Sequence, residues 1–478
     1  MYTSTNTNSA SWPIKFSKLS IIYGLLVPLL ISLFYSQYFI PKELYFVGTI
    51  VIITFFLALP YYEKKWQIIE KKQFEKRLFW TSVFFRLIYI LYLYTLTFIT
   101  QPENFPFELN ASDSLTYHIA AIQLKDFSFS EFFSLLKNLM KSRSDFGYPI
   151  YQAFIYKIFG PYTLPVRLFN VLLGSYTVLL LSRIARFIFT EKNARVTGII
   201  AMLFPSLLWY GAIQLKETLM IFIIVFIFYH SLKIHFVKKR IFRSIFYIIV
   251  FSGVLFYFRT FLAVLVITSY LIFLLLNSKS KNSILINSIS VVVIIFGLWF
   301  LYLNADIYQD VEEQYSDREG FLSRNLNDAK DKLGNVNYSN AAVAPLIVSG
   351  AFFTPFPSFL YTEDRQYPII AHYQNELVKN IIYYFGFLGL IFVFKKEFFL
   401  KSIMLSFFVL SYLFVLMFTA NSFIDRFQLV NVPFIIIFIS VGLINIKTIW
   451  RERFPYFLIL LLIMHITWVV FKVNIRGI

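Results

Sequence analysis

The sequence contains no cysteine and few charged residues. Without cysteine the chain cannot form disulfides, use a thiolate nucleophile or bind zinc or iron–sulfur clusters through sulfur, so any metal would need oxygen or imidazole ligands. Only 15% of the 478 residues are charged, whereas 58% are hydrophobic and 21% aromatic. A glycine-rich nucleotide loop and a Walker pattern are also missing, which argues against an ATP-driven pump. The composition predicts a polytopic membrane protein.

Apolar runs predict an all-α fold with about thirteen transmembrane helices. A run of about 20 apolar residues spans the ~30 Å hydrocarbon layer of a bilayer. The predicted spans are residues 20–39, 43–61, 78–100, 163–186, 196–213, 217–234, 244–258, 260–276, 284–303, 378–394, 401–419, 427–446 and 456–471.

Basic residues predict the orientation of these spans. Segments such as "EKKWQIIEKKQFEKR" and "HFVKKRIFR" all fall on one side if the spans alternate, and the positive-inside rule makes that side cytoplasmic. The polar N-terminus, with Lys15 and Lys18 before the first apolar run, resembles a cytoplasmic signal anchor. The net charge of +18 therefore arises mainly from basic residues in the predicted cytoplasmic loops, and no nucleic acid partner is predicted.

Two long segments face outward and divide the chain. Residues 1–77 hold the N-terminal tail and two spans, and 78–303 form a transmembrane core with a first outward loop at 101–162. In that loop "SEFFSLLKNLM" and "YPIYQAFIYKIFG" are amphipathic and aromatic, as expected of helices in the membrane interface. Residues 304–377 predict a second outward loop that forms a flap or cap, and 378–478 hold the C-terminal spans.

The motif "ASDSLTYHIAAIQL" follows the third span and joins an acid to two proton-carrying side chains. Asp113 and Tyr117 are four residues apart and share a face if the segment is helical, with His118 next to them. A partly desolvated carboxylate at the membrane surface can act as a general base toward a hydroxyl or amine. The alternative is an Asp that caps a helix, followed by interfacial Tyr and His anchors.

Further charged residues are predicted at the outer ends of spans. They are Asp145 before "GYPIYQAFIYKIFG"; Lys216 and Glu217 in "IQLKETL"; Arg259 in "LFYFRTFLAV"; and Arg426 in "NSFIDRFQLV". Cations that meet above an apolar groove suit a lipid-linked phosphate, Arg through bidentate hydrogen bonds and Lys as a point charge. The alternative is that each is a snorkelling anchor.

The order of these motifs resembles the GT-C type of polytopic glycosyltransferases, in particular the protein O-mannosyltransferase and lipid A aminoarabinose transferase-like group. The motifs are "DSLTYH", "YPIYQAFIYKIFG" with "PVRLFNVLLG", "LKETLM" after "FPSLLWYGAI", and "DRFQLVNVPFIII". They cover about residues 75–275 and 378–446. The chain departs from the family at Ser114, where many members have a second acid, at Tyr148 before Pro149, and in having two early spans instead of one.

The resemblance implies hexosyl or pentosyl transfer from a polyprenyl-phosphate-linked sugar to an acceptor glycan, lipid or protein. It places the site on the outer face of a bacterial plasma membrane. Asp113 would be the base, with Tyr117 and His118 shaping its surroundings. The loop around Asp145 would lie near the donor, with the three cations as donor-phosphate contacts: Lys216, Arg259 and Arg426.

Two other functions stay open at this point: an O-antigen or capsule repeat-unit polymerase, and a lipid or polysaccharide transporter. A transporter would place ionisable groups near the bilayer midplane, whereas here they concentrate at the predicted outer ends of spans, with Arg86 and His230 as exceptions. No metal site is predicted because the histidines lack metal-ligand spacing. No cofactor is specified, and a role for a divalent cation is left open.

Overall fold

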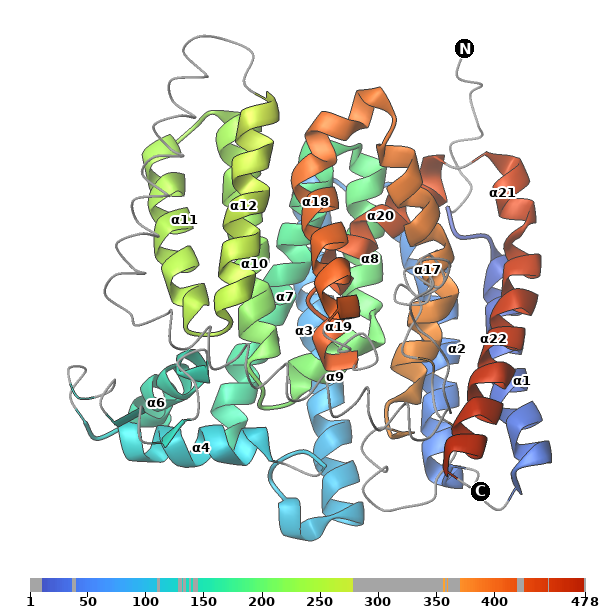
Figure 1. Cartoon of the computed structure of the whole chain (residues 1–478), viewed down its shortest axis with the longest axis horizontal. Helices are drawn as coiled ribbons and strands as arrows, with labels where there is room; N and C mark the ends of the chain where they lie inside the picture. The colour runs from blue at the N-terminus through green and yellow to red at the C-terminus, as the bar shows by residue number, and fades with distance from the viewer. Residues whose placement is uncertain are drawn as a thin grey trace, which may run out of the picture.

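The protein is a bundle of long helices with two short helices lying across one end (Figure 1). It is described here from a computed structural model. The structure describes residues 11–36, 40–109, 112–127, 145–277, 370–418, 425–445 and 447–476, together with Glu131, Leu135, Leu136, Leu139, Met140, Phe356 and Phe359. No strand occurs among these residues, so the predicted all-α fold is confirmed.

In the part of the chain that the structure describes, eight helices are long and apolar enough to cross a membrane. They are α1 (Ile14–Phe34), α2 (Lys42–Trp66), α3 (Lys71–Thr100), α7 (Thr163–Ile188), α10 (Glu217–Val237), α12 (Thr260–Asn277), α17 (Tyr373–Val393) and α18 (Lys396–Phe418). Two shorter apolar helices accompany them, α11 (Ile241–Phe256) and α20 (Val432–Asn445), together with the apolar part Phe454–Val470 of α22 (Phe454–Arg476). Each predicted span within the described part of the chain overlaps a helix, although 427–446 combines the short helix α19 (Asp425–Gln428), a turn at 429–431 and α20. The span at 284–303 lies outside that part, and the count of about thirteen stays a prediction.

The span predicted at 196–213 is a bent pair of helices. Helix α8 (Glu191–Leu203) and helix α9 (Pro205–Ala212) meet at an angle of 50°. Pro205 causes the break, because the residue before a proline is pushed out of the helical region, and Phe204 is extended with ψ 116°. The bend directs α9 and the tight turn after it toward the end of the bundle that carries the candidate site.

Helices α17 and α20 form the closest helix pair in the core. A Cβ on Gly389 of α17 would collide with the backbone carbonyl of Phe438, and one on Gly442 of α20 with that of Phe385. Small residues let helix backbones approach to this distance, and packing in a membrane depends on such contact. α17 begins at Tyr373, so its first turn extends into the segment expected to be loop.

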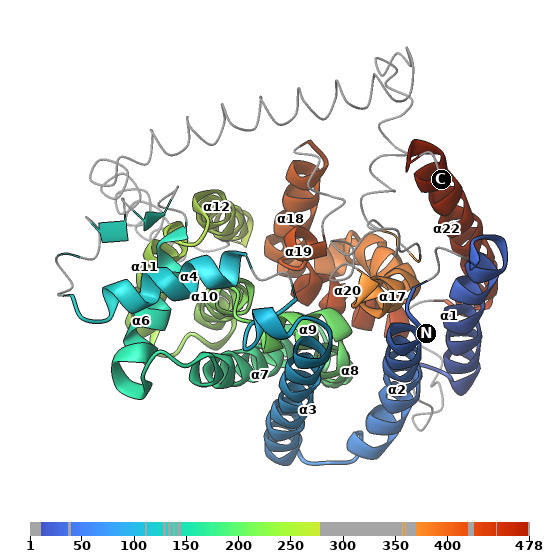
Figure 2. The same cartoon turned by 90° about the horizontal axis from the view of Figure 1, so that it is seen from below.

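The two ends of the bundle differ in architecture. Helix α4 (Asp113–Leu124) and helix α6 (Gly147–Phe159) lie crosswise at one end, and Figure 2 views the molecule from that side. The basic α10–α11 connection and the α17–α18 connection lie at the other end (Figure 1). α6 confirms the second amphipathic helix expected in the first loop; most of the first, "SEFFSLLKNLM", and most of 304–377 lie outside the described residues.

Candidate active site

Asp113 lies at the first position of α4, where its carboxylate faces a cation from the far end of the sequence. Ser112 is the N-cap and makes no side-chain capping bond. Arg426, in the short helix α19 (Asp425–Gln428), donates from Nη1 to Oδ2 of Asp113. The Asp113 side chain keeps 49% of its surface exposed. The carboxylate is therefore held by a guanidinium that is far away in the sequence, and it stays accessible to a substrate.

Arg426 is held in place by a second acid. Its Nε donates to Oε1 of Glu217, which is fully buried at the first position of α10. A helix N-terminus favours a negative side chain, so Glu217 is stabilised there even without water. Burial alone would lower the pKa of Arg426, but the two carboxylates raise it above its ordinary value. Arg426 is thus a permanently charged link between Asp113 and the bundle.

A parallel ion pair joins Asp145 to Lys216. Lys216 Nζ donates to Oδ1 of Asp145 and to the backbone carbonyl of Phe258 at 3.2 Å. Tyr117 donates its hydroxyl to the same Asp145 oxygen at 3.3 Å. Burial lowers the pKa of Lys216, and the Asp145 charge opposes that shift. The same two factors raise the pKa of Tyr117, burial first, so its phenol stays a neutral donor.

A close approach of α6 to the α11–α12 turn positions this second pair. Gly147, the first residue of α6, donates to the carbonyl of Tyr257 at 2.9 Å. A Cβ at Gly147 would collide with the ring of Phe258. Arg259 comes next in the turn and places its guanidinium 4.4 Å above the ring of Phe427. The glycine therefore brings Asp145, Lys216 and Arg259 to one place.

Seven of the eight candidate residues meet around one cavity of about 430 Å³. Asp113, Tyr117, Asp145 and all three cations line it, and Glu217 lies behind it as the partner of Arg426. The remaining lining residues are Thr116, Leu139, Met140 and Phe427. The cavity thus combines three cations with two carboxylates, one of them half exposed.

His118 lies elsewhere. It is five residues from Asp113, one position off the face that Tyr117 shares, and its Nδ1 is 2.6 Å from the hydroxyl of Tyr156. It packs edge-on against Phe107 and lines a separate aromatic cavity of about 460 Å³. Burial lowers the pKa of His118. The structure does not place His118 with the other candidate residues.

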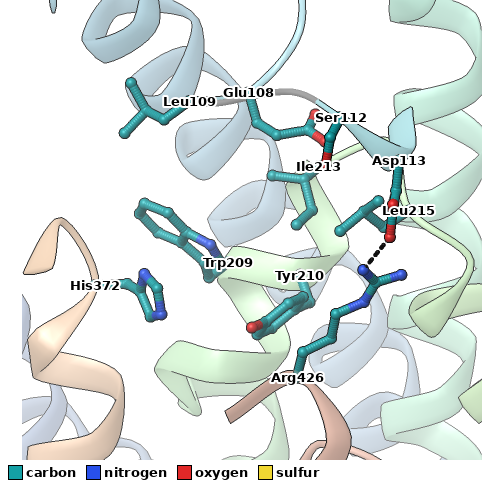
Figure 3. A pocket seen from close by; sticks show the side chains of 10 residues that line it. All are labelled: Glu108, Leu109, Ser112, Asp113, Trp209, Tyr210, Ile213, Leu215, His372 and Arg426. Carbon is teal, nitrogen blue, oxygen red and sulfur yellow. Dashed lines mark hydrogen bonds and ion pairs between the residues drawn. The ribbon is translucent and has the colours of Figure 1, made fainter. Parts of the chain in front are cut away.

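A second cavity of about 180 Å³ lies on another side of the Asp113–Arg426 pair (Figure 3). Its walls include Glu108, Trp209, Tyr210 and His372, none of which the sequence had marked as a site residue. Glu108 carried a usable signal, since it is an acid in the first outward loop five positions before Asp113. Trp209 and His372 carried none, because an aromatic residue in an apolar helix and a single histidine occur widely without function.

A metal site is not apparent in the part of the chain that the structure describes. No group of three or more His, Asp or Glu side chains is placed there to hold an ion. The carboxylates near the cavity are instead matched to cations. Asp113 faces Arg426, and Asp145 faces Lys216. This arrangement suits the binding of an anion and the acceptance of a proton.

Residues 146–303 match the family model described as dolichyl-phosphate-mannose-protein mannosyltransferase. The chain is similar to GT-C type membrane glycosyltransferases. The match covers about a third of the 478 residues, including Lys216, Glu217 and Arg259 but neither Asp113 nor Arg426. It supports the family resemblance seen in the motifs without separating the mannosyltransferase and aminoarabinose transferase subgroups. No curated protein matches the chain.

Proposed function

We propose that this protein transfers a sugar from a polyprenyl-phosphate-linked donor to an acceptor hydroxyl or amine at the outer face of the plasma membrane. The carrying observation is the meeting of Asp113 with Lys216, Arg259 and Arg426 around one cavity at an end of a membrane bundle. These residues come from four separate segments. The match to a mannosyltransferase family supports the same chemistry.

The three cations suit the phosphate of the donor. A sugar phosphodiester carries one negative charge, and the departing polyprenyl phosphate gains another as the bond to the sugar breaks. Preorganised positive charge near that oxygen stabilises the transition state more than the ground state. Arg259 and Arg426 can donate paired N–H bonds, whereas Lys216 contributes a point charge.

Asp113 suits the role of general base. It accepts the proton of the acceptor group as the acceptor attacks the anomeric carbon, and the C1–O bond to phosphate breaks with its electron pair left on the phosphate. No covalent bond to the protein forms. A single displacement of this kind inverts the anomeric centre. Asp145 is the second acid at the cavity, and its ion pair makes it a positioning group for Lys216.

A single-turnover assay of purified Asp113→Asn with a polyprenyl-phosphate-linked mannose tests the proposal. The amide keeps the size of the side chain but cannot accept the proton, so we expect transfer to slow by about 10²–10⁴-fold with donor binding nearly unchanged. Asp145→Asn is the matched control and should lose far less rate at saturating donor. Normal turnover by Asp113→Asn with a dead Asp145→Asn would assign the base to Asp145.

The products distinguish the transferase from the polymerase considered above. A transferase extends each acceptor by one sugar, with the opposite anomeric configuration to the donor. A ladder of repeat units would contradict the proposal and identify a polymerase. Retention of the anomeric configuration would contradict the single displacement.

A further inference from the structure

The second cavity at Asp113 has the properties of a binding site (Figure 3). Its volume of about 180 Å³ compares with the ~10–15 Å³ needed by a single water, so it admits a small organic group. It shares Asp113 and Arg426 with the larger cavity. The base therefore borders two cavities, only one of which is lined by Lys216 and Arg259.

Aromatic rings form one wall of this second cavity. Trp209 and Tyr210 are consecutive residues of α9, and the ring of His372 lies 5.1 Å from the Trp209 ring at an angle of 35°. Tyr92 meets the Trp209 ring edge-on at 6.2 Å, which fixes the indole in place. Figure 3 shows the two α9 rings on one side of the cavity. Trp209 is 6% and Tyr210 7% exposed, so each ring borders the cavity with only a small part of its apolar surface.

Polar groups lie at the opposite rim. Glu108 and Ser112 approach the cavity beside Asp113 (Figure 3). Oε2 of Glu108 is buried and makes no hydrogen bond within the described residues; its nearest cation is Arg167 Nη2 at 3.8 Å. This oxygen has almost no accessible surface, so a ligand in the cavity can reach Glu108 only through the rest of its side chain, which is 12% exposed. The rim therefore favours a ligand that donates several hydrogen bonds.

We propose that this cavity is the acceptor subsite and that it takes a sugar ring of a glycan acceptor. A pyranose has a face of C–H bonds that suits the Trp209 wall and a rim of hydroxyls that suits Glu108 and Ser112. A hydroxyl on that ring lies next to Asp113, whose other side borders the cation-lined cavity. The assignment rests on the proposed function and adds the class of acceptor, since a serine or threonine side chain has no ring to cover Trp209.

Acceptor kinetics of Trp209→Leu and Trp209→Phe test the assignment, with methyl α-mannoside and methyl β-galactoside as probe acceptors and a serine-rich peptide as the comparison. We expect Trp209→Leu to raise the acceptor KM by about tenfold, the scale of a lost aromatic contact, and Trp209→Phe to restore most of it. Glu108→Gln should also raise the acceptor KM. The donor KM and the slow hydrolysis of donor by water should stay unchanged in all three variants.

Each outcome separates the subsite from the function. An unchanged acceptor KM in Trp209→Leu, with donor hydrolysis intact, overturns the subsite and leaves the transferase standing. Transfer to the peptide but to neither glycoside overturns the glycan assignment. Failure of the unmodified protein to transfer or hydrolyse the donor overturns the proposed function itself. Unchanged donor hydrolysis in Trp209→Leu also shows that the variant has folded.

Discussion

Two ion-pair networks lie at opposite ends of the bundle and differ in what surrounds them. At the basic end Glu75 accepts hydrogen bonds from Arg183 at 2.6 Å and Arg186 at 2.8 Å, and Glu191 accepts from Arg186 at 2.6 Å and Arg195 at 3.1 Å. These side chains come from α3, α7 and α8, which pack against one another. At the site end the pairs join segments as distant as Asp113 and Arg426.

The comparison shows that ion pairs alone do not mark a site. Each carboxylate of the basic-end network bridges two guanidiniums and links helix ends. The cations of the site end face a cavity of about 430 Å³, and Arg259 contacts a ring there. Arg426 is bridged as well, between Asp113 and Glu217, so the two ends differ in the cavity and not in the bridging: charges that line a cavity can meet a ligand, whereas the basic-end pairs only link helix ends. Loss of donor binding in a basic-end variant, with no loss in the site-end variants, would contradict this distinction.

The largest expected difference between the two ends is in the labelling of introduced cysteines, which should be complete at one end and absent at the other. The chain has no cysteine, so single cysteines report without background. Ser112→Cys lies at the site end and Gln73→Cys in the first turn of α3 at the basic end, and both positions are exposed. We expect an impermeant thiol reagent to label Ser112→Cys in intact cells and to leave Gln73→Cys unlabelled. The opposite pattern would move the site to the cytoplasmic face.

The next effect is on donor affinity. Removing one charge-assisted contact to phosphate costs about 1.5–3 kcal/mol, so Lys216→Ala, Arg259→Ala and Arg426→Ala should each weaken donor binding by about 10- to 150-fold. Arg195→Ala, in the basic-end network, should lower the melting temperature by a few degrees and leave donor affinity unchanged. Donor titrations and thermal scans measure both. Unchanged donor affinity in all three site variants would reduce these cations to interfacial anchors.

The smallest expected effect is a pH dependence. Since burial lowers the pKa of Lys216 and Asp145 opposes this, Lys216 should lose its charge at a lower pH than an ordinary lysine. Donor affinity should therefore fall by about tenfold or less at alkaline pH. Asp145→Asn removes the opposing charge and should move that fall to lower pH, whereas Lys216→Arg should abolish it. A fall that survives in Lys216→Arg belongs to another group.

The sequence predicted the fold class because membrane spanning depends on local chemistry. A run of apolar residues long enough to cross hydrocarbon indicates a helix by itself, and each predicted span in the described part of the chain overlaps a helix between α1 and α22. The bend at Pro205 was missed, because 196–213 was predicted as one span although proline disfavours helix at the residue before it. Alternation of the spans placed Asp113, Lys216, Arg259 and Arg426 at one surface.

Only the tertiary structure decided which of those residues meet. The one-residue offset between Tyr117 and His118 on α4 directs the first toward Asp145 and the second toward Tyr156. The pairing of Asp113 with Arg426 joins residues 313 positions apart, and it depends on how α4, α10 and α19 pack. Span prediction fixes the depth of a residue in the membrane. Position within the membrane plane is set by helix packing, whose contacts join residues far apart in sequence and leave no periodic signal in the chain.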